Sequence, residues 1–286
     1  MSLALPGGIA LTTGSASGIG QAVTIAYAKA GVEGILACDI NFDGLDPTIE
    51  GCKKVAVHPN FRILPFKVDV RTDRDVINMV ETAVKEFGRL DYAANVAGIS
   101  CSATSSSILG NPHVITQIVV KQVLTVDQTM DDWDNIHAIN VRGVFLCMRE
   151  EIRVMLKNEL RSLIPDRAPT RGSIVNMGSL ASVTPVAGMT AYTAAKHAVV
   201  GMTKAAAVSH SGDGIRINTV NPGYTLTPQA RAFVADFTPY DNGTLLKRMG
   251  SPEEMADATL FLSSPLSSYM TGSSIYSDGG AMVLLK

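Results

Sequence analysis

The sequence predicts a single α/β domain, built as a doubly wound, seven-stranded parallel sheet with helices on both faces. Segments of strand length alternate with segments of helical periodicity along almost all of the 286 residues. The strand segments are apolar nearly throughout, which is typical of parallel strands buried on both faces. The first strand also passes through a glycine-rich turn directly into a helix. Together these observations indicate strands and helices packed in layers around one sheet.

The first half of the chain contains four strand segments and two helical segments. Both helical segments carry apolar residues at helical spacing, and each ends at a glycine, Gly31 or Gly88, that can cap the last turn. The predicted strands are 8–14, 33–40, 61–70 and 90–98, and the predicted helices are 18–31 and 73–88.

The second half continues the alternation with three helices and three strands. Ser251 suits the start of the last helix as a cap, Pro252 suits its first turn, and Glu254 can close a capping box. The predicted helices are about 130–158, the segment 191–208 and one starting at 251, and the predicted strands are 172–179, 215–223 and 271–280.

Two segments interrupt this alternation. Residues 100–128 are long for a connection between a strand and a helix, and residues 161–172 form a shorter loop with prolines and arginines. Long loops in compact domains are often functional, and disorder is the alternative. In the first segment, "VITQIVV" favours a small extra strand or an interface that contacts substrate or another subunit. We therefore expect one domain over residues 1–286, with insertions near these two segments.

Composition and charge exclude several classes of partner. Hydrophobic residues make up 46% of the chain and the net charge is only −2, which gives no attraction for nucleic acid or an anionic membrane. The N-terminus lacks the basic region of a signal peptide, and no apolar run has the length of a membrane span. The four cysteines lack CxxC spacing, which predicts reduced thiols in a cytoplasmic protein. The five histidines are far apart, so we expect no metal site.

The turn after the first strand has the features of a dinucleotide site. In "TGSASGIG" (13–20), three glycines let the backbone approach a pyrophosphate, and the next helix offers free N–H groups and the positive end of its dipole. Asp39 follows Gly20 by 19 positions, where a carboxylate would bond a ribose 2′-OH and repel a 2′-phosphate. No arginine or lysine lies in the turn or beside Asp39, which favours NAD over NADP. The alternative is a tight turn with a capping aspartate.

Three more polar or small residues come at the carboxyl ends of predicted strands, where ligands of open α/β sheets bind. Asp69 ends the third strand and is a candidate acceptor for the adenine amino group, although it could instead cap the next helix. Asn95 and Gly98 end the fourth strand, where small residues would let adenosine lie against the backbone. Their common position predicts the adenosine half of the site.

The helix 191–208 carries a phenol and an ammonium on one face. Tyr192 and Lys196 are four positions apart, so a helix places one above the other. A nearby ammonium lowers the pKa of a phenol from about 10, and such a phenol can pass a proton to and from an alcohol or ketone oxygen. Ser179, thirteen residues earlier at the end of a strand, can donate to the same oxygen. The alternative is a surface pair or a lysine that reaches past apolar surface to water.

In order and spacing, these motifs resemble the short-chain dehydrogenase/reductase family, in its TGxxxGIG branch. The resemblance extends from the first strand to the C-terminal "DGGA", nearly the whole chain, and it implies a Rossmann-type domain. The matching motifs are "TGSASGIG" (13–20), "DV" (69–70), "NVAG" (95–98), Asn140 in "IHAINVRGVF", Ser179, "YTAAK" (192–196) and "NPGYTLT" (221–227).

The resemblance implies a catalytic tetrad and a nicotinamide site. Tyr192 would be the acid and base, and Lys196 would also hold the nicotinamide ribose hydroxyls. Asn140 would bind a water that relays protons from Lys196 to solvent. The implied tetrad is Asn140, Ser179, Tyr192 and Lys196. The implied cofactor-binding residues are Gly14, Ser17, Gly18, Ile19, Gly20, Asp39, Asp69, Val70, Asn95, Gly98, Tyr192, Lys196, Gly223, Thr225 and Thr227.

Two residues depart from the sequence pattern of the family. Val96 replaces the second Asn of the common NNAG motif, and Thr225 stands where the family usually has Val or Ile against the nicotinamide. Since that contact is usually made by the main chain, we expect it to be retained. Thr227 would contact the carboxamide or the diphosphate.

The small residues of helix 191–208 are similar to a four-helix subunit interface of the family. They imply a homodimer or homotetramer, and the alternative is a helix buried within one subunit.

These features predict an NAD(H)-dependent oxidoreductase that interconverts a secondary alcohol and a ketone. Substrate recognition is expected from residues 180–190, 224–250 and 100–125. The first two of these segments are mostly apolar, which predicts a largely apolar, bulky substrate such as a terpenoid, polyketide or steroid-like alcohol of secondary metabolism. One alternative keeps NAD bound but gives an isomerase or cyclase with no net redox change. The other is a non-catalytic protein that senses the dinucleotide.

Overall fold

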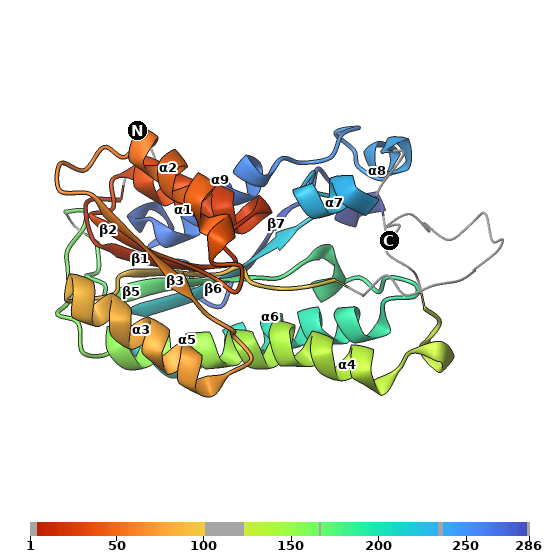
Figure 1. Ribbon diagram of the computed structural model, residues 1–286, viewed down its shortest axis with the longest axis horizontal. Coiled ribbons are helices and arrows are strands. Elements are labelled where there is room, and N and C mark those ends of the chain that lie inside the picture. Colours follow the sequence, from red (N-terminus) through yellow and green to blue (C-terminus); the bar gives the residue numbers. More distant parts are fainter. Residues whose placement is uncertain (1–4, 101–122, 166, 234–236, 285–286) are drawn as a thin grey trace.

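A single seven-stranded sheet organises the molecule in the computed structural model, which describes residues 5–100, 123–165, 167–233 and 237–284. The strands are all parallel and follow the order β3-β2-β1-β4-β5-β6-β7, which confirms the predicted fold class (Figure 1). The strands are β1 (Ile9–Thr13), β2 (Gly34–Asp39), β3 (Arg62–Lys67), β4 (Tyr92–Asn95), β5 (Gly172–Met177), β6 (Ile215–Pro222) and β7 (Ser274–Ser277).

Helices cover both faces of the sheet. Figure 1 shows α1, α2 and α9 on one face and α3, α4, α5 and α6 on the other. These helices are α1 (Gly18–Ala30), α2 (Asp46–Val55), α3 (Asp73–Phe87), α4 (Met130–His137), α5 (Val144–Met155), α6 (Thr190–His210) and α9 (Pro252–Ser263). Three short helices, α7 (Pro228–Phe233), α8 (Thr238–Asn242) and α10 (Ala281–Leu284), complete the second half.

Alternate residues of the central strands supply two apolar cores, one on each side of the sheet. In β1, Ala10 packs in the core beneath α1 and α9, while Leu11 packs in the core beneath α3 and α5. In β2, Ile35 and Leu36 divide in the same way. Because successive side chains of a strand point to opposite faces, a strand buried on both sides is apolar throughout. This is the physical origin of the continuous apolar segments in the sequence.

The strand order creates a crevice at the carboxyl ends of β1 and β4. The chain leaves β1 toward β2 and β3, and then returns past β1 to form β4 on its other side. The α-helices that follow β1 and β4, which are α1 and α4, lie on opposite faces of the sheet, and the space between the two strand ends is where open α/β sheets bind ligands.

The predicted single helix over about 130–158 is wrong. The structure has two α-helices, α4 and α5, joined by a π-helical turn over Ala138–Gly143. Asn140 lies within this turn, and its side-chain amide bonds the main-chain N–H and C=O of Ile99, at N–O distances of 2.9 and 2.7 Å. One widened turn hardly changes the apolar periodicity, so the sequence pattern did not reveal it.

The two predicted glycine caps and the capping box are confirmed. Gly31 and Gly88 end α1 and α3 with φ of 99° and 84°. At the start of α9, Ser251 Oγ accepts from the N–H of Glu254, and the Glu254 carboxylate accepts from the N–H of Ser251. Helix α2, by contrast, was not predicted. Among the described residues, no helix combines the length and the apolar character needed to cross a membrane.

The two predicted insertions have different outcomes. Most of 100–128 lies outside the described residues. The described residues of the segment 161–172 lie at the amino-terminal edge of the sheet, where Arg161 and Thr170 pair through two main-chain hydrogen bonds of 2.9 Å. They are therefore on the side of the molecule opposite the β1/β4 crevice.

Candidate active site

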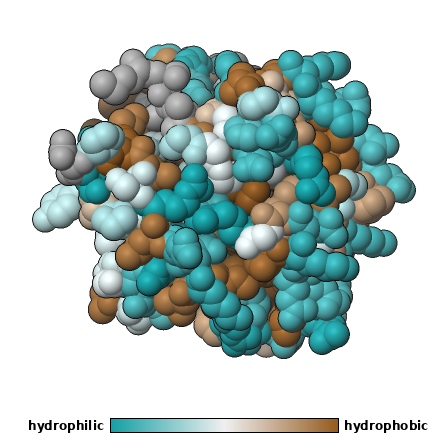
Figure 2. Space-filling view, turned by 90° about the vertical axis from the view of Figure 1, so that its left-hand side faces the viewer, coloured by the Kyte–Doolittle hydropathy of each residue, from teal (hydrophilic) through white to brown (hydrophobic). Residues whose placement is uncertain are grey.

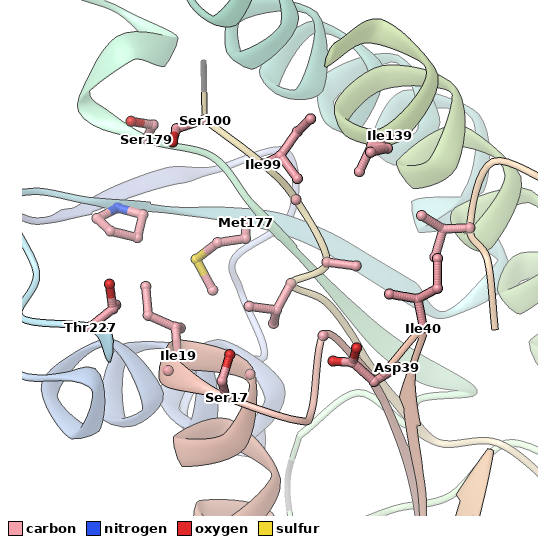
Figure 3. A pocket seen from close by; sticks show the side chains of 18 of the residues that line it. Ser17, Ile19, Asp39, Ile40, Ile99, Ser100, Ile139, Met177, Ser179 and Thr227 are labelled. Carbon is pink, nitrogen blue, oxygen red and sulfur yellow. The ribbon is translucent and has the colours of Figure 1, made fainter. Parts of the chain in front are cut away.

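A cleft of about 640 Å³ opens at the carboxyl ends of the strands, and it brings together most of the predicted site residues. Figure 3 looks into this cleft, with Ser17, Ile19 and Asp39 toward one end and Ser100 and Ser179 toward the other. The predicted residues that line it are Gly14, Ser17, Gly18, Ile19, Gly20, Asp39, Asp69, Val70, Gly98, Ser179, Tyr192, Lys196, Gly223, Thr225 and Thr227. Asn95 and Asn140 are not among the lining residues.

The glycine-rich turn is built so that no side chain could replace two of its glycines. Gly14 has a φ of 74°, and a Cβ there would lie 2.9 Å from the main-chain nitrogen of Ala97. A Cβ on Gly20 would overlap the carbonyl oxygen of Gly14. The backbone of β1 thus turns tightly beneath the start of α1, close to the end of β4.

The N-terminus of α1 faces the cleft without an acidic side chain in its first turn. Ser17 precedes the helix in an extended conformation and makes no side-chain cap hydrogen bond. The first N–H groups of a helix have no partner within the helix, and its dipole favours a negative charge at this end. These residues therefore fit the diphosphate of a nicotinamide dinucleotide.

Asp39 is held rigidly at the end of β2. Its Oδ2 accepts from the N–H of Ala16 at 2.9 Å, and its Oδ1 accepts from the N–H of Asn41 at 2.9 Å. The first of these bonds ties the carboxylate to the glycine-rich turn. Asp39 therefore carries its negative charge at a fixed position on the cleft wall, as expected for a residue that would hold a ribose diol.

Arg71 is a cleft residue that the sequence reasoning missed. It lines the wall next to Asp69, and the two side chains form a bidentate pair, with Nε–Oδ1 at 2.9 Å and Nη2–Oδ2 at 2.6 Å. The hydrogen bonds from Arg71 hold the pKa of Asp69 below its usual value. Its position two residues after Asp69 was a hint in the sequence that Arg71 lies near the cleft. The ion pair between Arg71 and Asp69 could not be predicted from that position alone.

At the other end of the cleft, α6 presents Tyr192 and Lys196 together, as their spacing predicts. The Lys196 ammonium lies 5.7 Å from the centre of the Tyr192 ring and donates to the carbonyl oxygen of Met177 at 2.9 Å. Burial lowers the pKa of Lys196 to about 8, since only 5% of this residue is exposed. A desolvated ammonium has a strong field, because little water screens it.

Ser179 occupies the turn between β5 and α6. Its extended backbone starts a short 3-10 turn, and its Oγ accepts from the N–H of Ala181 at 3.2 Å. The Ser182 hydroxyl in turn accepts from the N–H of Ser179 at 3.0 Å. This reciprocal cap leaves the Ser179 hydroxyl hydrogen free to point toward a ligand in the cleft.

Asn140 does not line the cleft but packs directly behind Ile99, which does. It is fully buried, and its amide bonds the main chain of Ile99. A Cβ added to Gly98 would lie 2.9 Å from Asn140 Oδ1 and 3.6 Å from Lys196 Nζ, so the two side chains approach each other across this glycine. The four residues of the predicted tetrad therefore gather at one end of the cleft, with Asn140 outside its lining.

Asn95 does not border the cleft, so its expected placement against adenosine is corrected. Its amide donates to Glu151 Oε2 on α5 and to Asn176 Oδ1 on β5, both at 2.9 Å. The Asn176 amide donates in turn to Thr203 on α6 at 2.9 Å. Successive residues of a strand face opposite sides, and Asn95 points into the layer of α5 and α6.

Comparisons with known proteins agree with this geometry. A family described as "Enoyl-(Acyl carrier protein) reductase" matches residues 14–282. "Short-chain dehydrogenase srdC" of Neurospora crassa is 34% identical over 272 residues, which is 93% of either chain. The chain belongs to the short-chain dehydrogenase/reductase family. This short-chain dehydrogenase/reductase is also 32% identical to the cyclohexanol dehydrogenase of an Acinetobacter strain, over 95% of this chain and 93% of that one. The crystal structure of levodione reductase superposes with a TM-score of 0.78 at 27% identity, covering 96% and 97%.

In this short-chain dehydrogenase/reductase, the exchange Gly98→Ala tests whether the position of Asn140 beside Gly98 and Lys196 matters for turnover. The added methyl group would displace the Asn140 amide, whose Oδ1 it would meet at 2.9 Å, and we expect kcat to fall by about tenfold or more. The measurement is steady-state turnover together with the melting temperature. Gly201→Ala on α6 is the matched control, because a Cβ there meets nothing within 4 Å. Equal turnover in both variants would contradict the prediction.

Proposed function

We propose that the protein is an NAD(H)-dependent oxidoreductase that interconverts a secondary alcohol and a ketone. The observation that carries the proposal is that one cleft holds a dinucleotide cradle at one end and Ser179, Tyr192 and Lys196 at the other. The names of the relatives are consistent with it, because cyclohexanol is a secondary alcohol and levodione is a ketone.

The residues of the chemical end have separable tasks in this proposal. The nicotinamide, when bound, supplies or accepts a hydride. Tyr192 donates its hydroxyl proton to the oxygen of a ketone, or takes the proton of an alcohol. Lys196 stabilises the phenolate that remains, because its charge lies near the ring and away from water. Ser179 provides a second donor to the same oxygen.

The pKa of Lys196 gives the proposed reaction a limit at high pH. The ammonium is charged below about pH 8 and loses its charge above it. As the charge is lost, less stabilisation of the phenolate remains. We therefore expect ketone reduction to decline above about pH 8, and a pH profile of kcat/KM would check this.

The choice of NAD over NADP rests in our proposal on the charge of Asp39. Arg71, the cation on the same wall, is already paired with Asp69, so it offers little compensation for a 2′-phosphate. Asp39→Asn removes the charge but keeps an amide of the same size. We expect the NAD-to-NADP ratio of kcat/KM to fall by about tenfold or more. Asp43→Asn, at an exposed residue outside the cleft lining, is the control, and an unchanged ratio in Asp39→Asn would contradict the prediction.

The proposed substrate is largely apolar. Ile99, Val186 and Met189 pack in the same apolar cluster as Tyr192, and Ile99 also lines the cleft. Thr184 in the segment 180–190 contacts Met282, so α10 also reaches this region. Parts of the expected substrate segments, 101–122 and 234–236, lie outside the described residues.

A panel of secondary alcohols and ketones tests the proposed function. The panel spans small hydroxy acids and bulky apolar alcohols, each with NAD(H) and NADP(H), and the absorbance of reduced nicotinamide reports turnover. We expect turnover of the apolar compounds with NAD(H). Product formation without a change in absorbance would indicate an isomerase or cyclase instead. Turnover of small hydroxy acids alone would contradict the apolar substrate.

We also propose a homodimer or homotetramer. Phe145 on α5 and Val208 on α6 are 45% and 85% exposed, which supports contact between copies along these helices. Light scattering of the purified protein would measure the assembly state, and a monomer at assay concentration would contradict this proposal.

A further inference from the structure

A second recess lies at the amino-terminal edge of the sheet, and none of its lining residues belongs to the cleft. Its volume is about 120 Å³, which is enough for a small ligand. Residues 161–165 and 167–172 close it against the starts of β4, β5 and β6 and the end of α9. Figure 2 views the molecule from this side and shows hydrophilic and hydrophobic side chains interspersed.

The recess has more positive than negative charge among its described lining residues. Arg161, Arg167 and Arg216 line it, and Asp91 is the one carboxylate that the described lining contributes. Asp91 is already paired with Arg89, at an Nη2–Oδ1 distance of 2.7 Å, and with Arg161 at 3.4 Å. Asp166, next to Arg167 in sequence, lies outside the described residues. The described residues around the recess thus leave a net positive charge.

Arg216 contributes a partly buried charge without a carboxylate partner in the described part of the chain. Its guanidinium donates to carbonyl oxygens at the end of α9, including Leu262 at 2.8 Å and Ser263 at 3.2 Å. Burial lowers the pKa of Arg216 to about 10, so the group stays charged at neutral pH. The carbonyls satisfy its N–H groups, but dipoles offset a full charge only in part.

Tyr92 brings an unused hydrogen-bond donor to the same recess. The residue is 2% exposed, and no described residue forms a hydrogen bond with its hydroxyl. Burial raises the pKa of this phenol, so it keeps its proton. A buried hydroxyl without a partner costs free energy unless a ligand satisfies it.

The two remaining arginines lie at the mouth of the recess. Arg167 donates through Nη1 to the carbonyl oxygen of Pro265 at 2.8 Å and to Ser268 Oγ at 3.0 Å, which holds the loop against the end of α9. Arg161 donates through Nη2 to the carbonyl oxygen of Pro6 at 3.1 Å. A guanidinium has five N–H donors, so both side chains retain the capacity to bind an anion.

We propose that this recess binds a small oxyanion, a phosphate or carboxylate group on a short stem. The Tyr92 hydroxyl is the buried donor, and Arg161 and Arg167 bind the anion at the mouth. Ile164 and Pro169 form apolar walls that fit a short organic stem and exclude a large one. The site does not depend on the proposed redox function, because it shares no residue with the cleft.

Calorimetric titration of the full chain with inorganic phosphate tests this proposal, with sodium chloride at equal ionic strength as the blank. We expect saturable binding to the unaltered protein. Tyr92→Phe keeps the ring that stacks on Tyr27 but removes the donor, and Arg167→Gln removes a charge at the mouth. Each exchange is expected to weaken phosphate binding at least tenfold.

Arg62→Gln supplies the matched control, because this arginine on β3 pairs with Glu86 at the surface, outside the recess. It should bind phosphate as the unaltered protein does. A second titration with acetate distinguishes a carboxylate from a phosphate ligand. Unchanged phosphate affinity in both Tyr92→Phe and Arg167→Gln would overturn the proposal, because the anion would then bind elsewhere, such as at the start of α1. Heats equal to those of chloride would also overturn it.

Discussion

Replacing Lys196 with Met is expected to abolish turnover and to stabilise the folded protein. Turnover falls because the charge that stabilises the Tyr192 phenolate is removed, and we expect a loss of about a thousandfold in kcat/KM. Stability rises because burial of the ammonium is unfavourable, as its lowered pKa shows. A methionine fills a similar volume without a charge to desolvate.

The size of this stabilisation follows from two opposing effects. Burial lowers the pKa of Lys196 from 10.5 to about 8, and each pKa unit corresponds to about 1.4 kcal/mol. Loss of the hydrogen bond to the Met177 carbonyl oxygen costs about 1 kcal/mol. We therefore expect the free energy of unfolding to rise by about 2 to 3 kcal/mol at pH 7.

The pH dependence of the effect identifies its cause. Below about pH 8 both the folded and the unfolded chain carry the charge, so the folded state of the unaltered protein bears the full penalty. Between pH 8 and 10.5 the folded lysine is neutral while the unfolded one is still charged, so the unaltered protein gains stability. The advantage of Lys196→Met should therefore shrink as the pH rises through this range. Denaturant unfolding at pH 7 and pH 10 measures it.

Two controls separate chemistry from packing. Tyr192→Phe should lose turnover to a similar extent without the gain in stability, because it removes a hydroxyl and no buried charge. Lys204→Met, at an exposed lysine of the same helix, should change neither quantity. A Lys196→Met protein that retained more than a tenth of the turnover would contradict the proposed task of the ammonium.

Glu151→Gln is expected to stabilise the protein strongly at neutral and alkaline pH and hardly at all at pH 4. Glu151 is fully buried on α5, and the amide of Asn95 donates to its Oε2 at 2.9 Å. Burial raises the pKa of Glu151 from 4.5 to about 8, against a smaller lowering by that hydrogen bond. Glutamine has the same shape and keeps an acceptor for Asn95, but it never ionises.

The sign of this effect follows from proton binding. Between pH 4.5 and about 8 the unfolded chain has lost the proton of Glu151 and the folded chain still holds it. The unaltered protein therefore loses stability as the pH rises through this interval. The difference between Glu151→Gln and the unaltered protein should grow over the same interval and then level off. At about 1.4 kcal/mol for each pKa unit, its upper bound is about 5 kcal/mol.

Denaturant midpoints at a series of pH values check the prediction, and the neighbouring carboxylate provides a control. Glu150 is also buried, but it pairs with Arg149 at 2.6 Å and with Arg153 at 2.7 Å. Glu150→Gln should therefore destabilise the protein, opposite in sign to Glu151→Gln. Parallel pH profiles of Glu151→Gln and the unaltered protein would show that Glu151 does not hold its proton to high pH.

Local patterns in the sequence were sufficient for the seven strands, for α1, α3, α6 and α9, and for the pairing of Tyr192 with Lys196. Apolar periodicity depends on which faces are buried, and residues four apart on a helix share a face whatever surrounds it. The glycine-rich turn was equally readable, because its conformation allows no side chain at Gly14 or Gly20. Three of the four cysteines, Cys38, Cys52 and Cys147, form no disulfide, as predicted, and the structure also shows that they are buried; Cys101 lies outside the described residues.

Contacts between distant segments could not be read in the same way. The π-helical turn at Asn140 depends on the main chain of Ile99, which belongs to another element. The sequence placed Asn95 with the cleft because the residue ends β4, yet its side chain joins Glu151 in the layer beneath. Arg71 became a cleft residue only through its pairing with Asp69.

The sequence by itself therefore determined the fold class, the glycine-rich turn and the shared helix face of Tyr192 and Lys196, because each follows from conformations and periodicities within a few consecutive residues. The tertiary structure alone decided that Glu151 and Lys196 are buried, and that Asn140 approaches Lys196 across Gly98. It also decided that residues 161–165 and 167–172 enclose a recess on the far side of the sheet. These features depend on which segments the topology brings together, because burial and charge pairing arise from contacts between residues that are distant in the sequence.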